Sequence, residues 1–337
     1  PLPPTPAVSV VMPVYNGAAF LEESVRSILD QTFSDLELIV VNDGSTDETA
    51  QVLAQIRDPR LRILNRPHEG VVHAPNAGAA LARAEWVARM DADDFAPPHR
   101  LEVQMREARS NRRLVVCVGG SKQLDSRRRV PRPWPANPRR ASPGRIRFDL
   151  CYRNPGQHAS ALFRKSAIEA VGGYRPGEDT AEDFGLFGRL ARVGEFTVFR
   201  EPLVLRRFHL GQVTVRRPDE MAAMGHEISK RHLREILGLS DSAADRAARI
   251  LQGSKGMGFR QWLWFLCVCA PRLRPFDAGL FAELRRQTCT RLCLSRPAWR
   301  GALRRFRAVA PVSTRKPEPA HHPAGCRERS IVLPGDP

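Results

Sequence analysis

Closely spaced aspartates are the residues of this sequence that could do chemistry most directly. Asp91 and Asp93 stand at alternate positions after the apolar run 86–90, in the stretch Met-Asp-Ala-Asp-Asp. Carboxylate oxygens suit Mg²⁺ or Mn²⁺, and such an ion can neutralise a nucleoside diphosphate as it leaves. An acidic turn without a metal is the alternative, because Asp-x-Asp alone is a weak signal.

Asp43 and Tyr15 are candidates for contact with a nucleotide. Asp43 lies in the turn sequence Asn-Asp-Gly, and Tyr15 follows Met12-Pro-Val14. Asp43 could accept a hydrogen bond from a base N–H, or it could serve the turn and cap a helix. Tyr15 could stack on the base, or it could close the edge of the core.

Asp183, in Ala181-Glu-Asp183, stands at the predicted start of a helix. Carboxylates are favoured there by the helix dipole, so capping is one interpretation. The other is a general base that takes a proton from an acceptor hydroxyl. His158 and His209 are isolated histidines, for which a structural role is the more common one.

Strands and helices alternate in the first half of the chain, and they must position these residues. Apolar runs predict strands over 8–14, 36–41, 61–64, 86–90 and 114–118, with helical patterns between them, including 45–56 after a capping-box sequence at Ser45, 70–83, and 97–109. This alternation predicts an α/β fold with a mostly parallel sheet covered on both faces. Ligands bind beyond the carboxyl ends of such strands, so Asp43, Asp91 and Asp93 should meet along one edge.

The second half of the chain is less regular. The Pro- and Arg-rich stretch 125–156 predicts a loop or lid without regular structure. Strand character returns over 157–163, a helix is predicted from 182 to about 193, and 220–251 has the pattern of an amphipathic helix. The stretch 311–337 lacks periodicity and is predicted to be disordered.

Charge is unevenly distributed. The net charge is +17; residues 1–215 hold 30 basic and 25 acidic side chains, and residues 216–337 hold 23 and 11. A basic C-terminal part favours a solvated surface or contact with an anionic membrane. No nucleic-acid motif accompanies the charge, so we expect no nucleic-acid partner.

Several protein classes are not indicated. The longest apolar run, 262–270, is shorter than the roughly 20 residues that span a bilayer. Residues 1–6 do not resemble a signal peptide, and seven cysteines without framework spacing suggest a reducing compartment. We therefore expect a cytoplasmic protein, peripheral at most on the inner face of a membrane. Phosphate-loop and dinucleotide fingerprints are missing, and Cys289 and Cys293 lack a second zinc-ligand pair.

Together, these segments resemble the family 2 glycosyltransferases of GT-A fold. The resemblance covers about 7–215, with a nucleotide-binding half at about 7–120 and an acceptor half at about 121–215; a helical extension at 216–252 and a basic, partly disordered tail at 253–337 would follow. The segments that carry it are Val10-Val-Met-Pro-Val-Tyr-Asn-Gly17, Ser27-Ile-Leu-Asp-Gln-Thr-Phe33, Val40-Val-Asn-Asp-Gly-Ser-Thr-Asp47, Asn76-Ala-Gly78, Ala88-Arg-Met-Asp-Ala-Asp-Asp94, Ala181-Glu-Asp183 and His209-Leu-Gly-Gln-Val213.

The resemblance implies an inverting transfer of a sugar, of hexosyltransferase type, from a nucleoside-diphosphate sugar to an acceptor hydroxyl. The acceptor would be a glycan or a lipid-linked molecule, as in the synthesis of cell-surface polysaccharide or glycolipid. Asp183 matches the general base, and Asp93, Asp91 and His209 match the residues around a divalent metal, Mg²⁺ or Mn²⁺. The nucleotide-binding positions match Pro13, Tyr15, Asp43 and Asp91, and the acceptor side matches His158 and Glu182.

Two departures from the family pattern leave other functions open. Gly185 and Phe187 stand where the family commonly has Asp and Trp, and Pro75 replaces a residue that belongs inside a helix. They are compatible with an altered acceptor pocket, or with an impaired homologue that acts as a binding or membrane-surface module. A sugar nucleotidylyltransferase is a further alternative, although it would need a Gly-rich N-terminal loop that Pro13–Gly17 does not supply.

Overall fold

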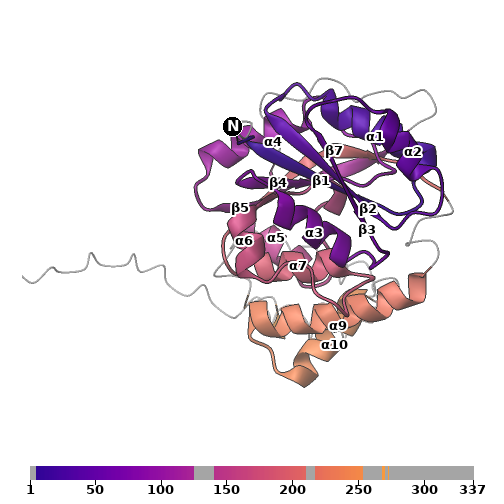
Figure 1. Cartoon of the computed structure of the whole chain (residues 1–337). Helices are drawn as coiled ribbons and strands as arrows, with labels where there is room; N and C mark the ends of the chain where they lie inside the picture. Colours follow the sequence, from indigo (N-terminus) through magenta and orange to yellow (C-terminus); the bar gives the residue numbers. More distant parts are fainter. Residues whose placement is uncertain (1–4, 125–139, 210–216, 253–267, 270–271, 273–337) are drawn as a thin grey trace, which may run out of the picture. The chain divides into compact units, whose positions relative to one another are not determined.

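A single mixed sheet forms the centre of the fold in the computed structural model (Figure 1), which describes residues 5–124, 140–209, 217–252, 268–269 and 272. Seven strands lie in the order β3-β2-β1-β4-β6-β5-β7. Their bounds are β1 Val8–Val14, β2 Leu36–Asp43, β3 Leu61–Arg66, β4 Trp86–Arg89, β5 Leu114–Gln123, β6 Leu162–Arg164 and β7 Glu195–Arg206.

Strand direction confirms the predicted α/β class. β1 pairs in parallel with β2 and β4, β2 with β3, and β5 with β7. Only the short β6 runs antiparallel, against both β4 and β5. The carboxyl ends of β1, β2 and β4 therefore meet at one edge of the sheet, which is where Tyr15, Asp43 and Asp91 follow their strands.

Helices cover both faces of the sheet (Figure 1). One core joins the sheet to α1, α2 and α4, and a second joins its other face to α3, α5, α6 and α7. The strands supply alternate side chains to the two cores: Val10 and Met12 face the first, and Val11 the second. The bounds are α1 Ala18–Leu29, α2 Thr49–Gln55, α3 His73–Leu81, α4 Arg100–Ser110, α5 Pro143–Leu150, η1 His158–Ser160, α6 Lys165–Ala170 and α7 Glu182–Leu190.

Two further helices follow the sheet, α9 (Pro218–Leu237) and α10 (Asp241–Gln252). The prediction of one helix over 220–251 was wrong at Gly238, which adopts a left-handed conformation with φ 62° and ends α9. The pair packs on itself, and α9 also contacts α5 and α7. An apolar cluster that includes Phe148, Leu233 and Leu251 joins α5 to both helices.

Helix starts differ from the prediction for local reasons. The helix expected over 70–83 begins at His73, so Pro75 lies in its first turn, where a backbone N–H has no intrahelical partner to lose. The helix expected from 45 begins at Thr49, because the Ser45 hydroxyl accepts a hydrogen bond from Asn16 N instead of capping α2. The helix expected from 97 begins at Arg100.

The stretch 125–156 was wrongly predicted to lack regular structure over its described part. α5 forms there because Ser142 caps it by accepting from Arg145 N, 3.2 Å away, and Pro143 occupies its first position. The remainder of that prediction, 125–139, lies outside the described residues, as does the predicted disorder of 311–337. The strand expected over 157–163 is divided between η1 and β6.

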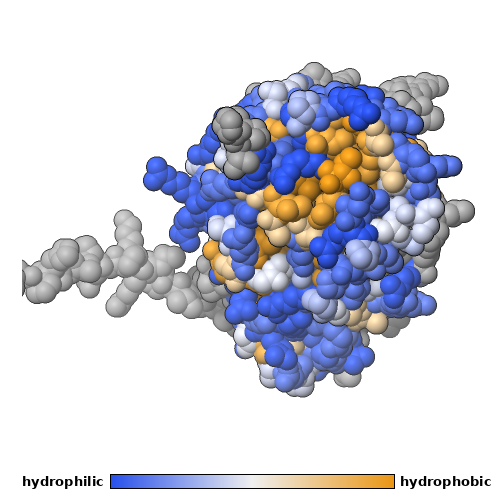
Figure 2. All heavy atoms as spheres, in the orientation of Figure 1, coloured by the Kyte–Doolittle hydropathy of each residue, from blue (hydrophilic) through white to orange (hydrophobic). Residues whose placement is uncertain are grey.

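On the face that Figure 2 shows, the surface over α9 and α10 is mainly hydrophilic. An apolar area lies in the upper half of the same view and is surrounded by hydrophilic residues. Among the described helices, none combines the length and hydropathy needed to span a bilayer.

Candidate functional site

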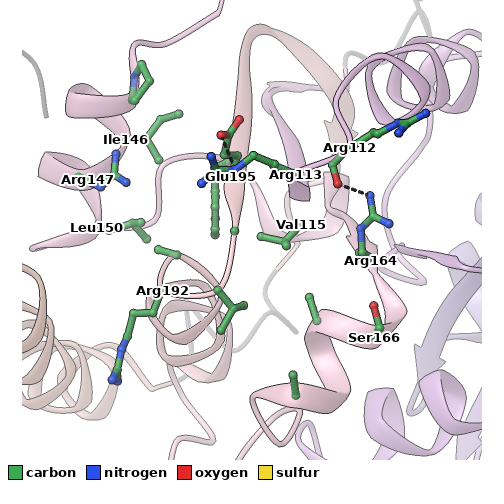
Figure 3. Close-up of a pocket in the computed structure, with 17 residues that line it drawn as sticks. Arg112, Arg113, Val115, Ile146, Arg147, Leu150, Arg164, Ser166, Arg192 and Glu195 are labelled. Carbon is green, nitrogen blue, oxygen red and sulfur yellow. Dashed lines mark hydrogen bonds and ion pairs between the residues drawn. The ribbon is translucent and has the colours of Figure 1, made fainter. Parts of the chain in front are cut away.

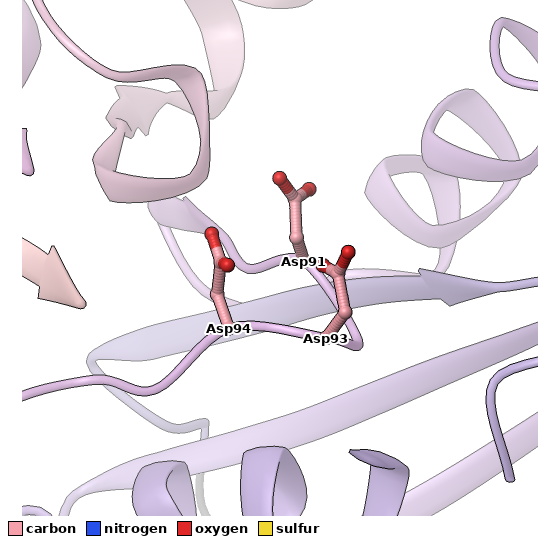
Figure 4. Close-up of side chains that lie close together, drawn as sticks. All are labelled: Asp91, Asp93 and Asp94. Carbon is pink, nitrogen blue, oxygen red and sulfur yellow. The ribbon is translucent and has the colours of Figure 1, made fainter. Parts of the chain in front are cut away.

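Three aspartates gather in the turn that follows β4 (Figure 4). Asp91, Asp93 and Asp94 each place a carboxylate oxygen within 4.8 Å of the others. The cluster exists because β4 ends at Arg89 and the chain turns at once, with Asp94 N donating to Asp91 O. Carboxylate oxygens are ligands that suit Mg²⁺ and Mn²⁺, so the residues present fit a divalent metal.

Asp91 and Asp93 each have a basic side chain as a neighbour, and Asp94 has a backbone N–H. Asp91 Oδ1 lies 2.8 Å from Arg89 Nη2, and Asp93 Oδ2 lies 2.8 Å from His209 Nε2. Asp94 Oδ1 accepts from Arg207 N at 3.1 Å. Asp94 is only 1% exposed, and burial together with the charges of Asp91 and Asp93 raises its pKa to about 8. The segment after β7 thus closes over the turn after β4.

Arg100 of α4 binds the backbone where this turn begins. Its side chain is fully buried, and its Nη2 donates to Arg89 O at 2.6 Å, the last carbonyl of β4. Burial lowers the pKa of Arg100 to about 10, so the guanidinium stays charged at neutral pH. The negative charge of Asp91 nearby offsets part of the cost of burying this cation.

Asp183 lies at the start of α7, where backbone N–H groups favour a carboxylate. Its Oδ1 accepts from Phe184 N and its Oδ2 from Asn154 Nδ2, both at 2.6 Å. Burial raises the pKa of Asp183 to about 6, and the charge of Asp91 contributes in the same direction. The carboxylate is therefore both a helix-terminus partner and a group that can exchange a proton near neutral pH.

The charge of Asp91 also acts on Glu182 and His158. Burial and the neighbouring Asp183 raise the pKa of Glu182 to about 8. His158 is 8% exposed, its Nε2 lies 2.8 Å from the Tyr174 hydroxyl, and burial lowers its pKa to about 3. His158 is thus neutral and bonded inside the protein. The expected contacts of Glu182 and His158 with an acceptor stay predictions.

Asp43 lies two strands away from Asp91 along the same edge, about 10 Å by the usual strand spacing. Its carboxylate accepts from Glu69 N and Gly70 N, both at 2.9 Å, and so fixes the loop after β3. Gly44, with φ 72°, allows this closeness, since a Cβ there would lie 2.6 Å from His68 N. A contact of Asp43 with a base would be additional to these bonds.

Tyr15 presents an aromatic face beside that loop. Its side chain is 48% exposed and its ring stacks on His68, with centroids 3.9 Å apart. His68 Nδ1 in turn lies 2.9 Å from Asp43 Oδ2. Pro13, in β1, lies opposite Val41 in the register. Tyr15, His68 and Asp43 thus form one connected group.

Residues of this arrangement that were not predicted include Asp94, Arg89, His68 and Asn154. Asp94 and Arg89 had a signal, because both adjoin the Asp-x-Asp pair. His68 and Asn154 had none, since they reach the site through contacts across 25 and 29 residues of sequence.

A cavity of about 670 Å³ lies elsewhere (Figure 3). Its walls include Val115 near the start of β5, Glu195 at the start of β7 and Arg164 at the end of the antiparallel β6. This is the end of the sheet opposite to the carboxyl end of β4. Three of the basic side chains there have acidic neighbours: Arg113 pairs with Glu195 at 3.1 Å, Arg164 with Glu85, and Arg192 with Glu235. The cavity is therefore separate from the aspartates.

The fold, with aspartates along the carboxyl ends of its parallel strands, is of the GT-A type. Residues 9–172 match the sequence model of glycosyl transferase family 2. Asp183 and α9 lie beyond the matched residues.

Curated relatives share this part of the chain. Chondroitin synthase of Pasteurella multocida is 26% identical over 219 residues, which are 64% of this chain and 22% of that protein. Hyaluronan synthase of Pasteurella multocida is 28% identical over 196 residues, 57% of this chain and 19% of that protein. An uncharacterized glycosyltransferase of Bacillus subtilis, EpsJ, is 36% identical over 135 residues, 39% of each chain. The chain thus spans about a fifth of the length of the two synthases.

Solved structures show the same fold. Staphylococcus aureus TarS 1–349 in complex with UDP-GlcNAc gives a TM-score of 0.55 at 17% identity, covering 80% of this chain and 81% of that one. The mannosyltransferase PcManGT of Pyrobaculum calidifontis, in complex with GDP-Man and Mn²⁺, gives 0.51 at 18% identity, covering 85% and 84%.

Proposed function

We propose that the protein transfers a sugar from a nucleoside-diphosphate sugar to an acceptor hydroxyl, with inversion at the anomeric carbon. One observation carries the proposal: the cluster of Asp91, Asp93 and Asp94 lies close enough to Asp183 for the charge of Asp91 to raise the pKa of Asp183. Such a transfer needs a group that compensates a leaving diphosphate and a group that takes a proton.

Asp183 is the proposed base. The acceptor oxygen forms a bond to the anomeric carbon while its proton passes to Asp183, and the bond from that carbon to the diphosphate oxygen breaks. Asn154 orients the carboxylate through its bond to Oδ2 and leaves that oxygen's second lone pair available. A pKa near 6 keeps Asp183 ionised at neutral pH while leaving it basic enough to accept the proton.

Asp91 and Asp93 are the proposed ligands of a divalent metal, with His209 beside them. A bound Mg²⁺ or Mn²⁺ would supply charge compensation for the diphosphate. Arg89 and Arg100 keep the turn in place and limit the mutual repulsion of its carboxylates. Tyr15 and Asp43 are the proposed contacts of the nucleoside, supported by the stacked Tyr15–His68 pair at the same edge.

Pro75 and Gly185, two of the observations that favoured an impaired homologue, have explanations in the packing. Pro75 lies in the first turn of α3, where it disturbs no helical hydrogen bond, and Gly185 leaves space that the buried Glu178 carboxylate fills. Both departures therefore have packing reasons. Acceptor identity, a cytoplasmic location and contact of the basic tail with an anionic membrane stay predictions, and the tail lies largely outside the described residues.

The proposal is tested by incubating the protein with Mn²⁺ and a panel of UDP-, GDP- and dTDP-sugars and sugar acceptors, and by following free nucleoside diphosphate. We expect Asp183→Asn and Asp93→Ala each to lower this release at least about 100-fold, with only Asp93→Ala weakening Mn²⁺-dependent nucleotide binding. Release at the wild-type rate in both variants would remove the assigned roles. Binding of no nucleoside diphosphate at all would contradict the function itself.

A further inference from the structure

Helix α9 contacts the residues on both sides of Asp183. Ala181 and Phe184 form a small apolar cluster with Ile228 of α9, and Met224 packs against it. The Phe184 ring also meets the His232 ring edge to face, with centroids 4.7 Å apart. Ala181 and Phe184, which flank Asp183 in the sequence, therefore both pack against α9.

The turn that leads into α7 is attached to the same helix. Ala181 N donates to Glu178 O at 2.8 Å and closes this turn. The buried Glu178 carboxylate lies 2.5 Å from Arg231 of α9 and 2.8 Å from Arg189 of α7. Thr180 Oγ1 donates to Glu220 O at the start of α9, at 3.4 Å. One ion pair and one hydrogen bond thus join the turn before Asp183 to α9.

Two glycines of α7 make room for these contacts. A Cβ at Gly185 would overlap the Glu178 carboxylate, and a Cβ at Gly188 would overlap the His232 ring. The two glycines are three residues apart and so lie on one face of α7. Gly185 was a departure from the family pattern, and its partner Glu178 is the residue that Arg231 binds. Gly185 and Gly188 of α7 therefore leave the space that the Glu178 carboxylate and the His232 ring occupy.

We propose that α9 is a positioning element for Asp183, acting through the Arg231–Glu178 pair and the Ala181–Phe184–Ile228 cluster. The proposal rests on the proposed function, in which Asp183 is the base. A base must be held in place to take a proton in the transition state, and a shift of about 1 Å can cost about 100-fold in rate. The segment 216–252, expected as an extension, would then be needed for catalysis.

Arg231→Met tests the ion pair without emptying the buried site, because Glu178 keeps Arg189 as a partner. Glu235→Gln is the matched control: it breaks the pair of Glu235 with Arg192, 3.2 Å long, which joins α9 to the segment beyond the far end of α7. We expect Arg231→Met to accelerate hydrogen exchange at 182–186 about tenfold, and to leave exchange at 91–94 unchanged. Arg231→Lys should restore much of the protection, and Glu235→Gln should leave it unaltered.

Gly185→Ala is a second test, because the added methyl must displace Glu178 from α7. Gly225→Ala is its control, since the site at Gly225 in α9 has no atom within 4 Å of an added Cβ. With a nucleotide sugar that the wild type cleaves, we expect Arg231→Met and Gly185→Ala to lower kcat about 10- to 100-fold with the donor KM within about twofold.

Unchanged exchange at 182–186 in both Arg231→Met and Gly185→Ala, each shown by circular dichroism to be folded, would overturn the proposal. Equal effects of Arg231→Met and Glu235→Gln would do the same, since they would indicate general loosening. Hydrogen exchange needs no substrate, so it decides the role of α9 separately. Failure of the wild type to bind UDP or GDP with Mn²⁺ would count against the proposed function alone.

Discussion

Asp91 connects the two acidic groups of the site. Its charge contributes to the raised pKa of Asp94 in the cluster and of Asp183 on α7, while its own carboxylate is paired with Arg89. Any ligand that neutralises Asp91 would lower the pKa of Asp183. In the proposed reaction, binding of the donor near Asp91 would therefore be linked electrostatically to the protonation of Asp183.

The pH dependence of kcat is a test of Asp183. Because the protonated form cannot accept a proton and its pKa is raised to about 6, we expect kcat to fall as the pH falls through about 6. Asp183→Asn should lower kcat about 10²- to 10⁴-fold and leave nucleoside diphosphate binding intact. A wild-type kcat that is constant from pH 5 to 8 would assign the proton transfer to another group.

Asn154→Ala gives an independent check of the same assignment. The Asn154 amide donates to Asp183 and favours its ionised form, so removal of this bond should raise the pKa of Asp183 further. We expect the acidic limb of the kcat profile to move to higher pH in this variant. A limb at the wild-type pH would show that the profile reports a different residue.

Tyr15 is the residue that we expect to stack on the base of the nucleotide. A base–aromatic stack is worth about 1–3 kcal/mol, so Tyr15→Ala should weaken UDP or GDP binding in Mn²⁺ by about 5- to 150-fold. Tyr15→Phe keeps the ring and should bind within about threefold of the wild type. Isothermal titration calorimetry separates the two variants. Wild-type affinity in Tyr15→Ala would place the base elsewhere along the edge.

At the scale of elements, strands could be predicted from the sequence where a run of apolar residues coincides with a strand that is buried in the fold. β1, β2 and β4 are short and buried, and β2 and β4 each lead into a turn with an acidic residue. β7 carried no such pattern, because Arg200 and Glu201 interrupt its buried residues, and its place is set by pairing with β5 across the sheet. The positions of Asp43 and Asp91 at one edge could therefore be predicted, whereas the bond between Asn154 and Asp183 could not.

Helix boundaries depended on contacts that sequence does not reveal. Ser45 had the pattern of a capping residue, yet its hydroxyl accepts from Asn16, 29 residues away. Ser142-Pro143 was a usable start signal for α5, but the surrounding prolines and arginines favoured a loop. Gly185 could be identified as unusual, and only the position of Glu178 explains it.

Helix α3 packs so closely on β1 and β2 that Gly78 has no space for a side chain. A Cβ there would overlap Val11 and lie 3.1 Å from Val41 Cγ2. We expect Gly78→Ala to lower the free energy of unfolding by about 1–3 kcal/mol, measured by urea denaturation. Gly225→Ala, in open space on α9, should be neutral or stabilising. Equal stability of the two variants would mean that α3 can move away from the sheet.

At the scale of the whole molecule, one continuous part of the chain reaches both halves of the site. Arg207 and His209, after β7, contact the turn of Asp93 and Asp94, and α9 then packs beside Asp183. His232 lies in this second contact, buried between α7 and α5, with Nδ1 donating to Leu150 O at 2.8 Å. The stability of the α9 contact should therefore depend on the protonation of His232.

Acid should weaken the fold through His232. Burial lowers its pKa to about 4, so the folded protein excludes a proton that the unfolded chain binds below about 6.5. Unfolding free energy should then fall by about 1.4 kcal/mol per pH unit for this group as the pH drops from about 6.5 toward 4. Asp94, Asp183 and Glu182, whose pKa values are raised, act in the opposite sense over their own ranges.

The contribution of His232 is isolated by comparison with His232→Asn, which keeps a donor near Leu150 O and cannot be protonated. We expect the variant to be less stable at pH 7, because the smaller side chain leaves a cavity. The difference in unfolding free energy from wild type should shrink as the pH falls from 6.5 to 4.5, since only the wild type must exclude a proton. Parallel stability curves for the two proteins, from urea denaturation at each pH, would show that His232 is protonated in the folded protein and does not hold α9 in a pH-dependent way.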